Sequence, residues 1–488
     1  MDQDTTVNHI LTLNHWIGGQ EVPPSSNTYL DDLNPVDDSV YARFARGNAK
    51  DMDQAVQVAH EAFQSFRHML AKDREALLCK AAALLEEQQQ EFIDILIDEV
   101  GSPIMKARFE VSFCLSFLRA AAGVPRRMKG ETLPSDMPGR FSMSVREPVG
   151  VVAGITPFNV PMIKGVKQSA MAVATGNTMV LLPSEEAPRL ALRLAKLWND
   201  AGLPQGVFNV VTGNGAEIGD ALTGHPLVRA ITFTGSSRVG KHIAELAAKD
   251  LKKYTLELGG KSPLIVFADA DLPAAVRAAV MGMFMYQGQV CMGSSRIFVE
   301  RQILPSFCEA FAAAAKNLKS GDLRDPTTVL APIINKRQRE RVRTHIEDAK
   351  TKGANLLAGG EFMGNQCKAT IFADVTPDMI LYREETFGPV TSVYAFDTMD
   401  EAIAKANDTD YGLSAAIFTQ DINKALIVAQ HVQSGMVHIN APSLHDEPHV
   451  PFGGIKNSGF GREGTETDLE LMTEWKWITV QLPGTAAH

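Results

Sequence analysis

The sequence predicts an α/β fold in which two doubly wound, parallel sheets follow one another along the chain. From residue 150 onward, short apolar runs rich in β-branched residues alternate with helical patterns, and Gly, Pro or Ser bounds each run. Alternating strands and helices require crossover connections, which produce a parallel sheet. The 488 residues are enough for two or three domains, and 45% hydrophobic with 21% charged residues is an ordinary globular composition.

The N-terminal third is predicted to be mostly helical. Apolar residues recur at helical spacing through residues 51–66, and the same period runs through residues 72–101. Gly101 marks the end of the second pattern, because glycine is a frequent helix stop.

Strands are predicted from Gly150 onward, where the apolar period changes. The first set covers residues 149–158, 178–184, 208–213 and 229–235, with helices at 187–202 and 236–250. The second set starts near Lys261 and covers residues 263–269, 295–300, 391–396, 413–419 and 436–440. Two such units in series indicate two domains with a cleft between them, and these sheets bind ligands at the carboxyl ends of their strands.

Two further segments have the pattern of extended chain. Residues 472–482 alternate apolar and polar side chains, as an edge strand does, and residues 128–150 form a proline-containing arm. No repeat of about 20 to 50 residues relates the two α/β units.

Charge and hydropathy exclude several kinds of partner. The net charge is −10 with no block of like charges, which argues against nucleic acid and anionic membranes. No apolar run reaches the roughly 18 residues of a membrane span, and the acidic start of the chain does not resemble a signal peptide. Five widely spaced cysteines form no CxxC pattern, so we expect a cytoplasmic protein without disulfides and without a bound metal.

Three segments carry residues suited to covalent chemistry. Cys291 lies in MYQGQVCMGSSR, Glu257 in TLELGGKSP, and Asn159 in ITPFN. A thiolate can add to an aldehyde carbon, a carboxylate in apolar surroundings can activate water, and an amide can hold the developing alkoxide. Each residue also has a simpler interpretation: a buried structural thiol, a carboxylate paired with Lys261, and a turn asparagine before Pro161.

The other four cysteines are interpreted as structural. Cys79, Cys114 and Cys308 fall in helical patterns, and Cys367 falls in a predicted loop.

With these motifs in this order, the chain resembles the NAD(P)-dependent aldehyde dehydrogenase superfamily from about Trp16 to Trp477. The resemblance implies a Rossmann-like NAD-binding domain from residues 1–127 and 149–259 and a catalytic domain at 260–445. It also implies a small β oligomerisation arm with a C-terminal strand (128–148 and 468–488) and a substrate-mouth loop (446–467). The implied assembly is a homodimer or homotetramer.

The implied cofactor is NAD, with NADP less favoured. No GxGxxG occurs, but Gly235, Ser236 and Gly240 lie between a strand and a helix, where backbone N–H groups can hold a phosphate. Glu185 follows a strand and could accept the ribose hydroxyls and repel a 2′-phosphate, or could simply be an acid at a helix N-terminus. The resemblance also assigns to the cofactor Thr156, Pro157, Leu258, Glu385 and Phe387.

The chain departs from the family at three positions. Leu182 replaces the usual lysine before the PSE element, Phe158 replaces a tryptophan, and Gln168 replaces a lysine, with Lys167 beside it. These departures resemble the branch that acts on aromatic aldehydes, such as benzaldehyde, salicylaldehyde and vanillin.

The candidate substrate tunnel is lined by large apolar residues, which would suit an aromatic ring. They are Phe158, Met162, Met285, Tyr286, Val290, Met292 and Phe452. The polar segment from His445 to His449 could reach a ring hydroxyl or could be solvated.

The predicted reaction is therefore NAD-dependent, non-acylating oxidation of an aldehyde. Thiolate attack by Cys291 and hydride transfer come first, and hydrolysis by water that Glu257 activates follows. Oxidation of an aliphatic aldehyde or a semialdehyde by the same mechanism is the alternative. Less favoured are a coenzyme A-acylating dehydrogenase, which would not need Glu257, a cysteine esterase, which would need a histidine partner, and a catalytically silent protein.

Overall fold

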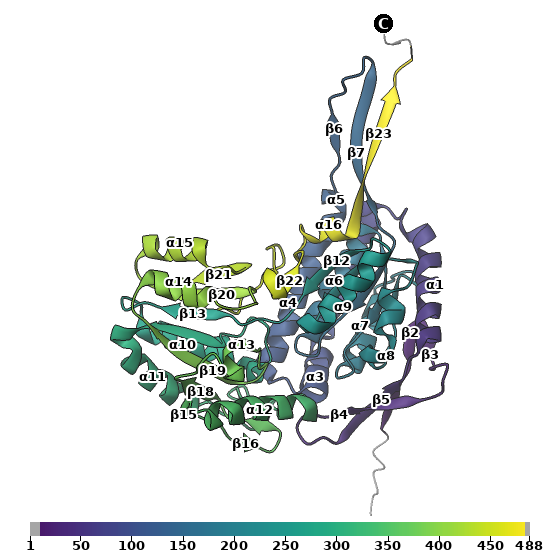
Figure 1. Ribbon diagram of the computed structural model, residues 1–488. Coiled ribbons are helices and arrows are strands. Elements are labelled where there is room, and N and C mark those ends of the chain that lie inside the picture. The colour runs from purple at the N-terminus through teal and green to yellow at the C-terminus, as the bar shows by residue number, and fades with distance from the viewer. Residues whose placement is uncertain (1–9, 484–488) are drawn as a thin grey trace, which may run out of the picture.

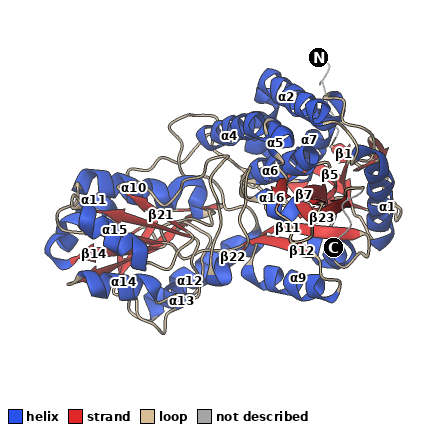
Figure 2. Cartoon of the chain, turned by 90° about the horizontal axis from the view of Figure 1, so that it is seen from above, coloured by secondary structure: helices blue, strands red, loops and turns tan. Residues whose placement is uncertain are grey.

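The computed structural model describes residues 10–483, and these fold into two α/β units that lie side by side (Figure 1). Each unit is built on its own sheet with helices against both faces (Figure 2). The α/β class with two doubly wound sheets is confirmed. The N-terminal stretch considered as a targeting signal lies partly outside the described residues, as does the end of the C-terminal segment.

The first sheet has eight strands in the order β22-β12-β11-β8-β9-β10-β2-β3. Five of them are parallel: β8 (Val151–Ile155), β9 (Thr178–Leu182), β10 (Phe208–Val210), β11 (Val228–Thr234) and β12 (Lys253–Glu257). Antiparallel edges are added by β2 (His15–Ile17), β3 (Gln20–Val22) and β22 (Gly459–Phe460). The winding direction reverses between β8 and β11, so a ligand crevice is expected at their carboxyl ends.

The second sheet has seven strands in the order β15-β18-β19-β14-β13-β20-β21. Six are parallel: β13 (Pro263–Val266), β14 (Arg296–Glu300), β18 (Thr370–Ala373), β19 (Val390–Phe396), β20 (Ser414–Phe418) and β21 (Met436–Ile439). Strand β15 (Asn355–Ala358) closes one edge in the antiparallel sense. Each predicted strand of both sets corresponds to a strand in the structure.

Helices of the first unit bury its sheet. They are α1 (Ala49–Phe66), α2 (Ala71–Glu87), α3 (Gln89–Val100), α4 (Ile104–Ala122), α5 (Val124–Arg127), α6 (Pro161–Thr175), α7 (Pro188–Asp200), α8 (Gly215–Thr223) and α9 (Ser237–Lys249). Every residue of α6 is buried. A helix buried all round lies in the interior of the unit, so its N-terminus, just after Asn159, has a fixed position.

The second unit carries longer loops as well as helices. Its helices are α10 (Leu272–Phe284), α11 (Leu304–Lys316), α12 (Lys336–Thr351), α13 (Ile380–Arg383), α14 (Met399–Asn407) and α15 (Ile422–His431). A 3-10 turn, η1 (Met285–Gly288), follows α10 and leads to Cys291. Further short pieces are η2 (Arg301–Ile303), η3 (Lys456–Ser458), β16 (Phe362–Met363) and β17 (Gln366–Cys367).

Three details differ from the sequence-based expectation. The pattern over residues 72–101 is two helices, because Gln88 leaves the helical backbone where no apolar residue lies between Leu85 and Phe92 to hold one continuous axis. The N-terminal third also contains a small sheet of β1 (Leu11–Leu13), β4 (Tyr29–Leu33) and β5 (Val40–Ala45). Cys367 lies in strand β17 and is buried. As expected, Gly101 ends α3 in the left-handed conformation.

A three-stranded arm projects from the first unit (Figure 1). Strand β7 (Arg140–Pro148) pairs on one side with β6 (Glu131–Leu133) and on the other with β23 (Thr473–Gln481), which a short helix, α16 (Asp468–Met472), precedes. The arm therefore joins two segments that are more than three hundred residues apart in the chain. Within residues 10–483, no helix is long and apolar enough to cross a membrane.

Candidate active site

The three residues predicted for covalent chemistry lie where the two units meet. Asn159 is buried between β8 and α6, and Glu257 is the last residue of β12. Cys291 comes from the second unit, in the loop between η1 and β14. The Glu257 segment reaches Cys291 through Gly260, where an added Cβ would come within 2.2 Å of the Cys291 carbonyl oxygen. Only glycine allows two backbones to approach so closely.

The surroundings of Cys291 disfavour a free thiolate. Burial raises the pKa of the Cys291 thiol to about 12. The carboxylates of Glu385 and Glu257 raise that pKa further, and the Lys164 ammonium opposes them. Because these charges act on the thiol, the structure brings the candidate nucleophile and the candidate base into one site.

Glu257 is a buried carboxyl group without a hydrogen-bond partner. Its residue is 2% exposed, and neither side-chain oxygen has a partner within the described part of the chain. Burial, followed by the charge of Glu463, raises the pKa of Glu257 well above its ordinary value. It is not paired with Lys261, whose ammonium donates instead to the backbone oxygen of Glu384 at 2.7 Å. A buried polar group left unpaired in this way is unusual and typical of functional sites.

Two buried lysines of α6 lie beside Glu257. The Lys164 ammonium donates to Glu463 at 2.6 Å, and the Lys167 ammonium lies 3.1 Å from Asp446 and 3.4 Å from Glu463. Burial alone would raise the pKa of Glu463, but the two ammonium groups outweigh it and lower that pKa. Glu463 therefore stays ionised while Glu257 tends to stay protonated.

The sequence did not predict the roles of Lys164 and Glu463. A signal for Lys164 exists, because a lysine among the apolar residues at the start of α6 must find a buried partner. The partner lies about three hundred residues away in the chain, which no local pattern can reveal. Lys167, which the sequence left without a role, forms an ion pair with Asp446 of the polar segment from His445 to His449. His445 and His449 are exposed and lie near Glu447.

The candidate tunnel residues fall into two groups. Phe158, Met285, Val290 and Met292 are partly exposed. Met162, Tyr286 and Phe452 are buried. Tyr286 is turned inward, because its hydroxyl donates to the backbone oxygen of Val100 at 2.7 Å. Phe452 packs against both lysines of α6, with each ammonium 4.8 Å from its ring centre.

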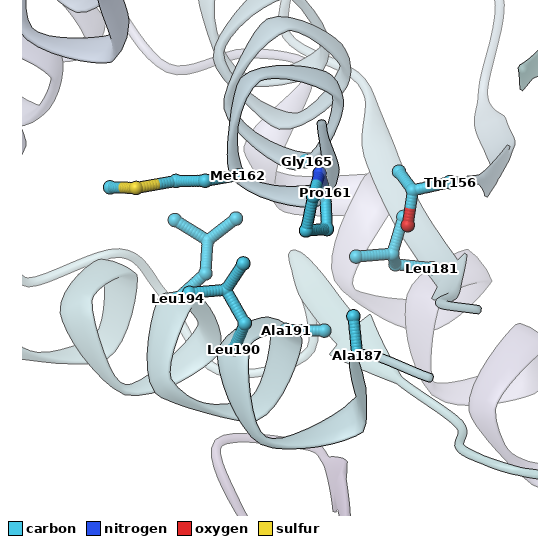
Figure 3. Close-up of a pocket in the computed structure, with 9 residues that line it drawn as sticks. All are labelled: Thr156, Pro161, Met162, Gly165, Leu181, Ala187, Leu190, Ala191 and Leu194. Carbon is cyan, nitrogen blue, oxygen red and sulfur yellow. The ribbon is translucent and has the colours of Figure 1, made fainter. Parts of the chain in front are cut away.

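A small apolar pocket lies between α6 and α7 (Figure 3). Thr156 and Met162, expected at the cofactor and substrate sites, line opposite sides of this pocket. Cys291 is not among its lining residues, so the side chain of Met162 faces a void within the first unit.

The turn from β11 to α9 has the features of a phosphate-binding helix start. Ser236 caps the helix, its hydroxyl accepting from Val239 N–H at 3.4 Å. A Cβ on Gly235 would come within 2.4 Å of the Phe233 ring, and one on Gly240 within 2.5 Å of Leu258. The glycines thus keep the backbone of the turn free of side chains, and unpaired N–H groups at such a helix start attract anions.

Two glutamates expected at the cofactor site have different environments. Glu185 is partly exposed just beyond β9, whereas its neighbour Glu186 accepts from the Asn335 amide at 2.5 Å. Glu385 accepts from Gly260 N–H at 2.9 Å, and burial raises its pKa to about 7. Phe387 follows Glu385 and meets Phe158 edge to face, with 5.8 Å between the ring centres.

A doubly wound sheet with a glycine-containing turn at a helix start, together with a cysteine, a buried carboxyl group and an amide where two units meet, is an arrangement typical of enzymes. A comparison with protein families makes this specific. The sequence model of the Aldehyde dehydrogenase family matches residues 22–478, and the chain belongs to that family.

Curated relatives match almost the whole chain. A vanillin dehydrogenase of Pseudomonas fluorescens is 40% identical over 468 residues, which cover 95% of this chain and 97% of the relative. A benzaldehyde dehydrogenase of Bacillus subtilis is 40% identical over 467 residues, which cover 96% of each.

Solved structures share the fold over the same length. An NAD-dependent aldehyde dehydrogenase from Sinorhizobium meliloti has a TM-score of 0.95 at 37% identity and covers 100% of this chain and 98% of its own. An E. coli NADP dependent enzyme has a TM-score of 0.94 at 35% identity, covering 97% and 98% respectively.

The buried Glu257 generates a prediction about stability. Folding raises the pKa of Glu257 above its ordinary value of 4.5. As pH rises above 4.5, the carboxyl group therefore ionises more readily in the unfolded chain than in the folded one, and the folded state becomes less stable. Glu257→Gln should therefore raise the free energy of unfolding by on the order of 1 kcal/mol or more at pH 8, with a much smaller gain at pH 4.5. Thermal unfolding measured at both pH values tests this.

The exposed Glu309→Gln serves as the matched control and should show no pH-dependent gain. An equal effect of Glu257→Gln at both pH values would contradict the assignment of Glu257 as a buried, unpaired carboxyl group.

Proposed function

We propose that this chain oxidises an aldehyde to the carboxylic acid, with NAD as the hydride acceptor and a covalent intermediate on Cys291. The observation that carries the proposal is the state of Glu257. Its carboxyl group is buried, has no hydrogen-bond partner in residues 10–483, and lies near enough to Cys291 to affect the pKa of the thiol. Such a group is available to take a proton during the reaction.

The first half of the reaction forms a carbon–sulfur bond. The partly exposed thiol of Cys291 must first lose its proton. Glu257, once it is ionised, can accept that proton and must pass it to solvent before it can act again in the second half of the reaction. The thiolate then adds to the aldehyde carbon, and the carbonyl oxygen becomes an alkoxide. The side-chain amide of Asn159 and the backbone N–H of Cys291 would hold that oxygen, and one such donor is typically worth about 2.7 to 4 kcal/mol in the transition state.

The second half releases the acid. When bound, NAD supplies the nicotinamide ring that accepts the hydride lost from the thiohemiacetal carbon. Glu257 then takes a proton from water, and the oxygen of that water attacks the thioester carbon. The carbon–sulfur bond breaks, the thiolate of Cys291 is restored, and the carboxylic acid leaves. A carboxyl group with a raised pKa is a stronger base for this step than an exposed glutamate.

The residues around β8, β9 and β11 fit a dinucleotide. We assign the pyrophosphate to the helix start at Gly235, Ser236 and Gly240, and the adenosine ribose to Glu185. Thr156, Pro157 and Leu258 border the same crevice, and Glu385 with Phe387 would support the nicotinamide ribose and ring. A carboxylate at Glu185 and the apolar Leu182 both favour NAD over NADP, since neither can hold a 2′-phosphate.

An aromatic aldehyde is the substrate class we favour. The support is the partly exposed, apolar set formed by Phe158, Met285, Val290 and Met292, together with the aromatic substrates in the names of both relatives. Phe452 and Met162 would contribute to the wall of the site from deeper positions. An aliphatic aldehyde or a semialdehyde oxidised by the same steps is the second candidate.

The domain roles follow from these assignments. We assign cofactor binding to residues 1–127 and 149–259, catalysis to residues 260–445, and the mouth of the substrate site to residues 446–467. Glu257 favours hydrolysis over transfer to coenzyme A, because a base that activates water would destroy the thioester. All five cysteines are free, as expected for a cytoplasmic enzyme.

The arm is the surface at which we propose that copies of this chain associate, as a homodimer or homotetramer. Trp475 is 47% exposed and Trp477 70% exposed, and Phe141 of the paired strand is 44% exposed. Large apolar side chains grouped on a projecting sheet are typical of a surface that a partner covers.

Catalysis is tested by NADH absorbance with NAD and benzaldehyde, compared with vanillin, hexanal and succinic semialdehyde, in the absence of coenzyme A. We expect turnover on the aromatic aldehydes. Cys291→Ala should abolish NADH formation, and Glu257→Gln should give a burst of about one NADH per site and then stop, because the thioester is not hydrolysed. Normal steady-state turnover by Glu257→Gln would show that another group is the base. Turnover on hexanal or the semialdehyde alone would contradict the aromatic assignment.

Cofactor choice is tested by the ratio of kcat/KM for NAD to that for NADP. The ratio should favour NAD. Glu185→Gln should lower this ratio about tenfold, because it removes the repulsion between the negative charge of Glu185 and the 2′-phosphate of NADP. Glu186→Gln is the matched control: its carboxylate is already bonded to Asn335, so the ratio should stay near the wild-type value. An unchanged ratio in Glu185→Gln would place the ribose elsewhere.

Association through the arm is tested by light scattering after size-exclusion chromatography. The double substitution Trp475→Ser with Trp477→Ser should lower the particle mass, because it removes exposed apolar area that a partner would bury. Leu70→Ser, which changes an apolar residue that is 59% exposed outside the arm, should leave the mass unchanged. Equal masses for wild type and double variant would exclude the tryptophans of the arm from the interface.

A further inference from the structure

We propose that Lys106, Glu110 and Tyr286 are positioning residues that set the separation between Cys291 and Asn159. The inference rests on the proposed function, since it concerns how the nucleophile and the oxyanion donor are held in place. The link between them runs through helix α4, which contacts a turn on the Cys291 side and the start of α6 on the Asn159 side.

The turn before Cys291 has an unusual backbone. Tyr286, Gln287 and Gly288 have φ values of 49°, 56° and 63°, so three successive residues lie in the left-handed region. Gly288 is required there, because a Cβ would come within 2.3 Å of the Gly388 carbonyl oxygen. Tyrosine and glutamine rarely adopt this conformation, so the contacts around them must hold it.

Three side-chain bonds to distant segments hold this turn. The Tyr286 hydroxyl donates to the Val100 oxygen at 2.7 Å, and the Gln287 amide donates to the Cys367 oxygen at 3.1 Å. The Gln289 oxygen accepts from Ile334 N–H at 3.0 Å. Of these three hydrogen bonds, the Tyr286 bond ends on helix α3 of the first unit, so Tyr286 ties the turn directly to the unit that contains Asn159.

Helix α4 completes the link through a buried ion pair. The Lys106 ammonium lies 4.1 Å from the centre of the Tyr286 ring and donates to the Ser102 hydroxyl at 3.1 Å. It also pairs with Glu110, one turn further along α4. Lys106 is 6% exposed and Glu110 fully buried, so neither charge has water to replace its partner. Breaking such a pair is far more costly than breaking a surface pair.

Glu110 carries the link to the other segment. Its second oxygen accepts from Ile163 N–H at 3.4 Å, in the first turn of α6. The residue before α6, Val160, has no side chain that could cap the helix, so Glu110 supplies that role from α4 and places negative charge at the helix N-terminus. Asn159 lies two residues before α6. One ion pair thus connects the turn that leads to Cys291 with the helix that follows Asn159.

Residues that only stabilise the fold would make the same contacts. The experiment therefore needs a measurement that does not depend on stability. We would measure kcat and KM for aldehyde and NAD, the rate at which iodoacetamide alkylates Cys291, and thermal unfolding. Tyr286→Phe removes one hydroxyl and keeps the ring beneath Lys106. It should lower kcat about tenfold and change the alkylation rate at least threefold, with KM for NAD unchanged and unfolding within a few degrees of wild type.

Two further sets of variants test the ion pair. Lys106→Met with Glu110→Met replaces it by apolar groups of similar length, which often preserves stability while removing the polar link. This double variant should also have a lower kcat than the wild type. Glu110→Gln keeps an acceptor for Ile163 N–H and should retain more activity than Glu110→Ala. Tyr394→Phe is the matched control, because this half-buried tyrosine of β19 packs on Phe298 and Tyr382 and its substitution should change neither kcat nor alkylation.

The proposal is overturned if Tyr286→Phe and the double methionine variant keep the wild-type kcat and alkylation rate, whatever their unfolding temperatures. It is also overturned if Tyr394→Phe has the same effect as Tyr286→Phe. Failure of the proposed function is distinguishable, because it would appear as absence of NADH formation in the wild type. In that case the alkylation rates of the variants still decide whether these residues position Cys291.

Discussion

The candidate site depends on one close approach between two backbones. Gly260 lies against the carbonyl oxygen of Cys291 with no room for a Cβ, and this contact is what joins a segment of the first sheet to a loop of the second. With any side chain there, the two loops would separate, and Glu257 could not lie beside the thiol. The neighbouring Gly259 has the same property toward the Glu385 carboxylate, which a Cβ would meet at 2.3 Å. The two glycines of TLELGGKSP are thus explained by sterics at the junction.

Electrostatics at this junction is a balance among buried groups. Four carboxyl groups (Glu257, Glu463, Asp446, Asp468) share their surroundings with two ammonium groups, Lys164 and Lys167, so they cannot all ionise at low cost. Glu463 and Asp446 form ion pairs with these lysines. Burial and the charge of Glu463 raise the pKa of Asp468 to about 7, and they raise that of Glu257 as well. Proximity to the lysines thus decides which group is left to exchange protons.

The sequence was sufficient to predict the features that depend on short-range patterns, namely strands, helices and the motifs of the site. Short apolar runs located most strands of both parallel sheets, although β12 and β18 were not predicted. The motifs around Asn159, Glu257 and Cys291 indicated covalent chemistry. It was insufficient where a distant partner decides the outcome. Lys164 needs Glu463, and the side chain of Tyr286 is turned inward by its hydrogen bond to Val100, which its apolar character alone does not indicate. The break at Gln88 coincides with the stretch between Leu85 and Phe92 that has no apolar residue, and helix propensity alone does not place it.

The left-handed turn before Cys291 has a consequence for how the protein matures. A turn that costs about 1–2 kcal/mol per left-handed non-glycine residue cannot form early on local interactions alone. Its three anchors, at Val100, Ile334 and Cys367, lie 186, 45 and 80 residues away from their partners in the chain, so they become available only after both sheets have assembled. The reactive thiol would therefore reach its working position among the last steps of folding. A chain stalled earlier would carry Cys291 without Glu257 and Asn159 beside it, so it could not complete the reaction.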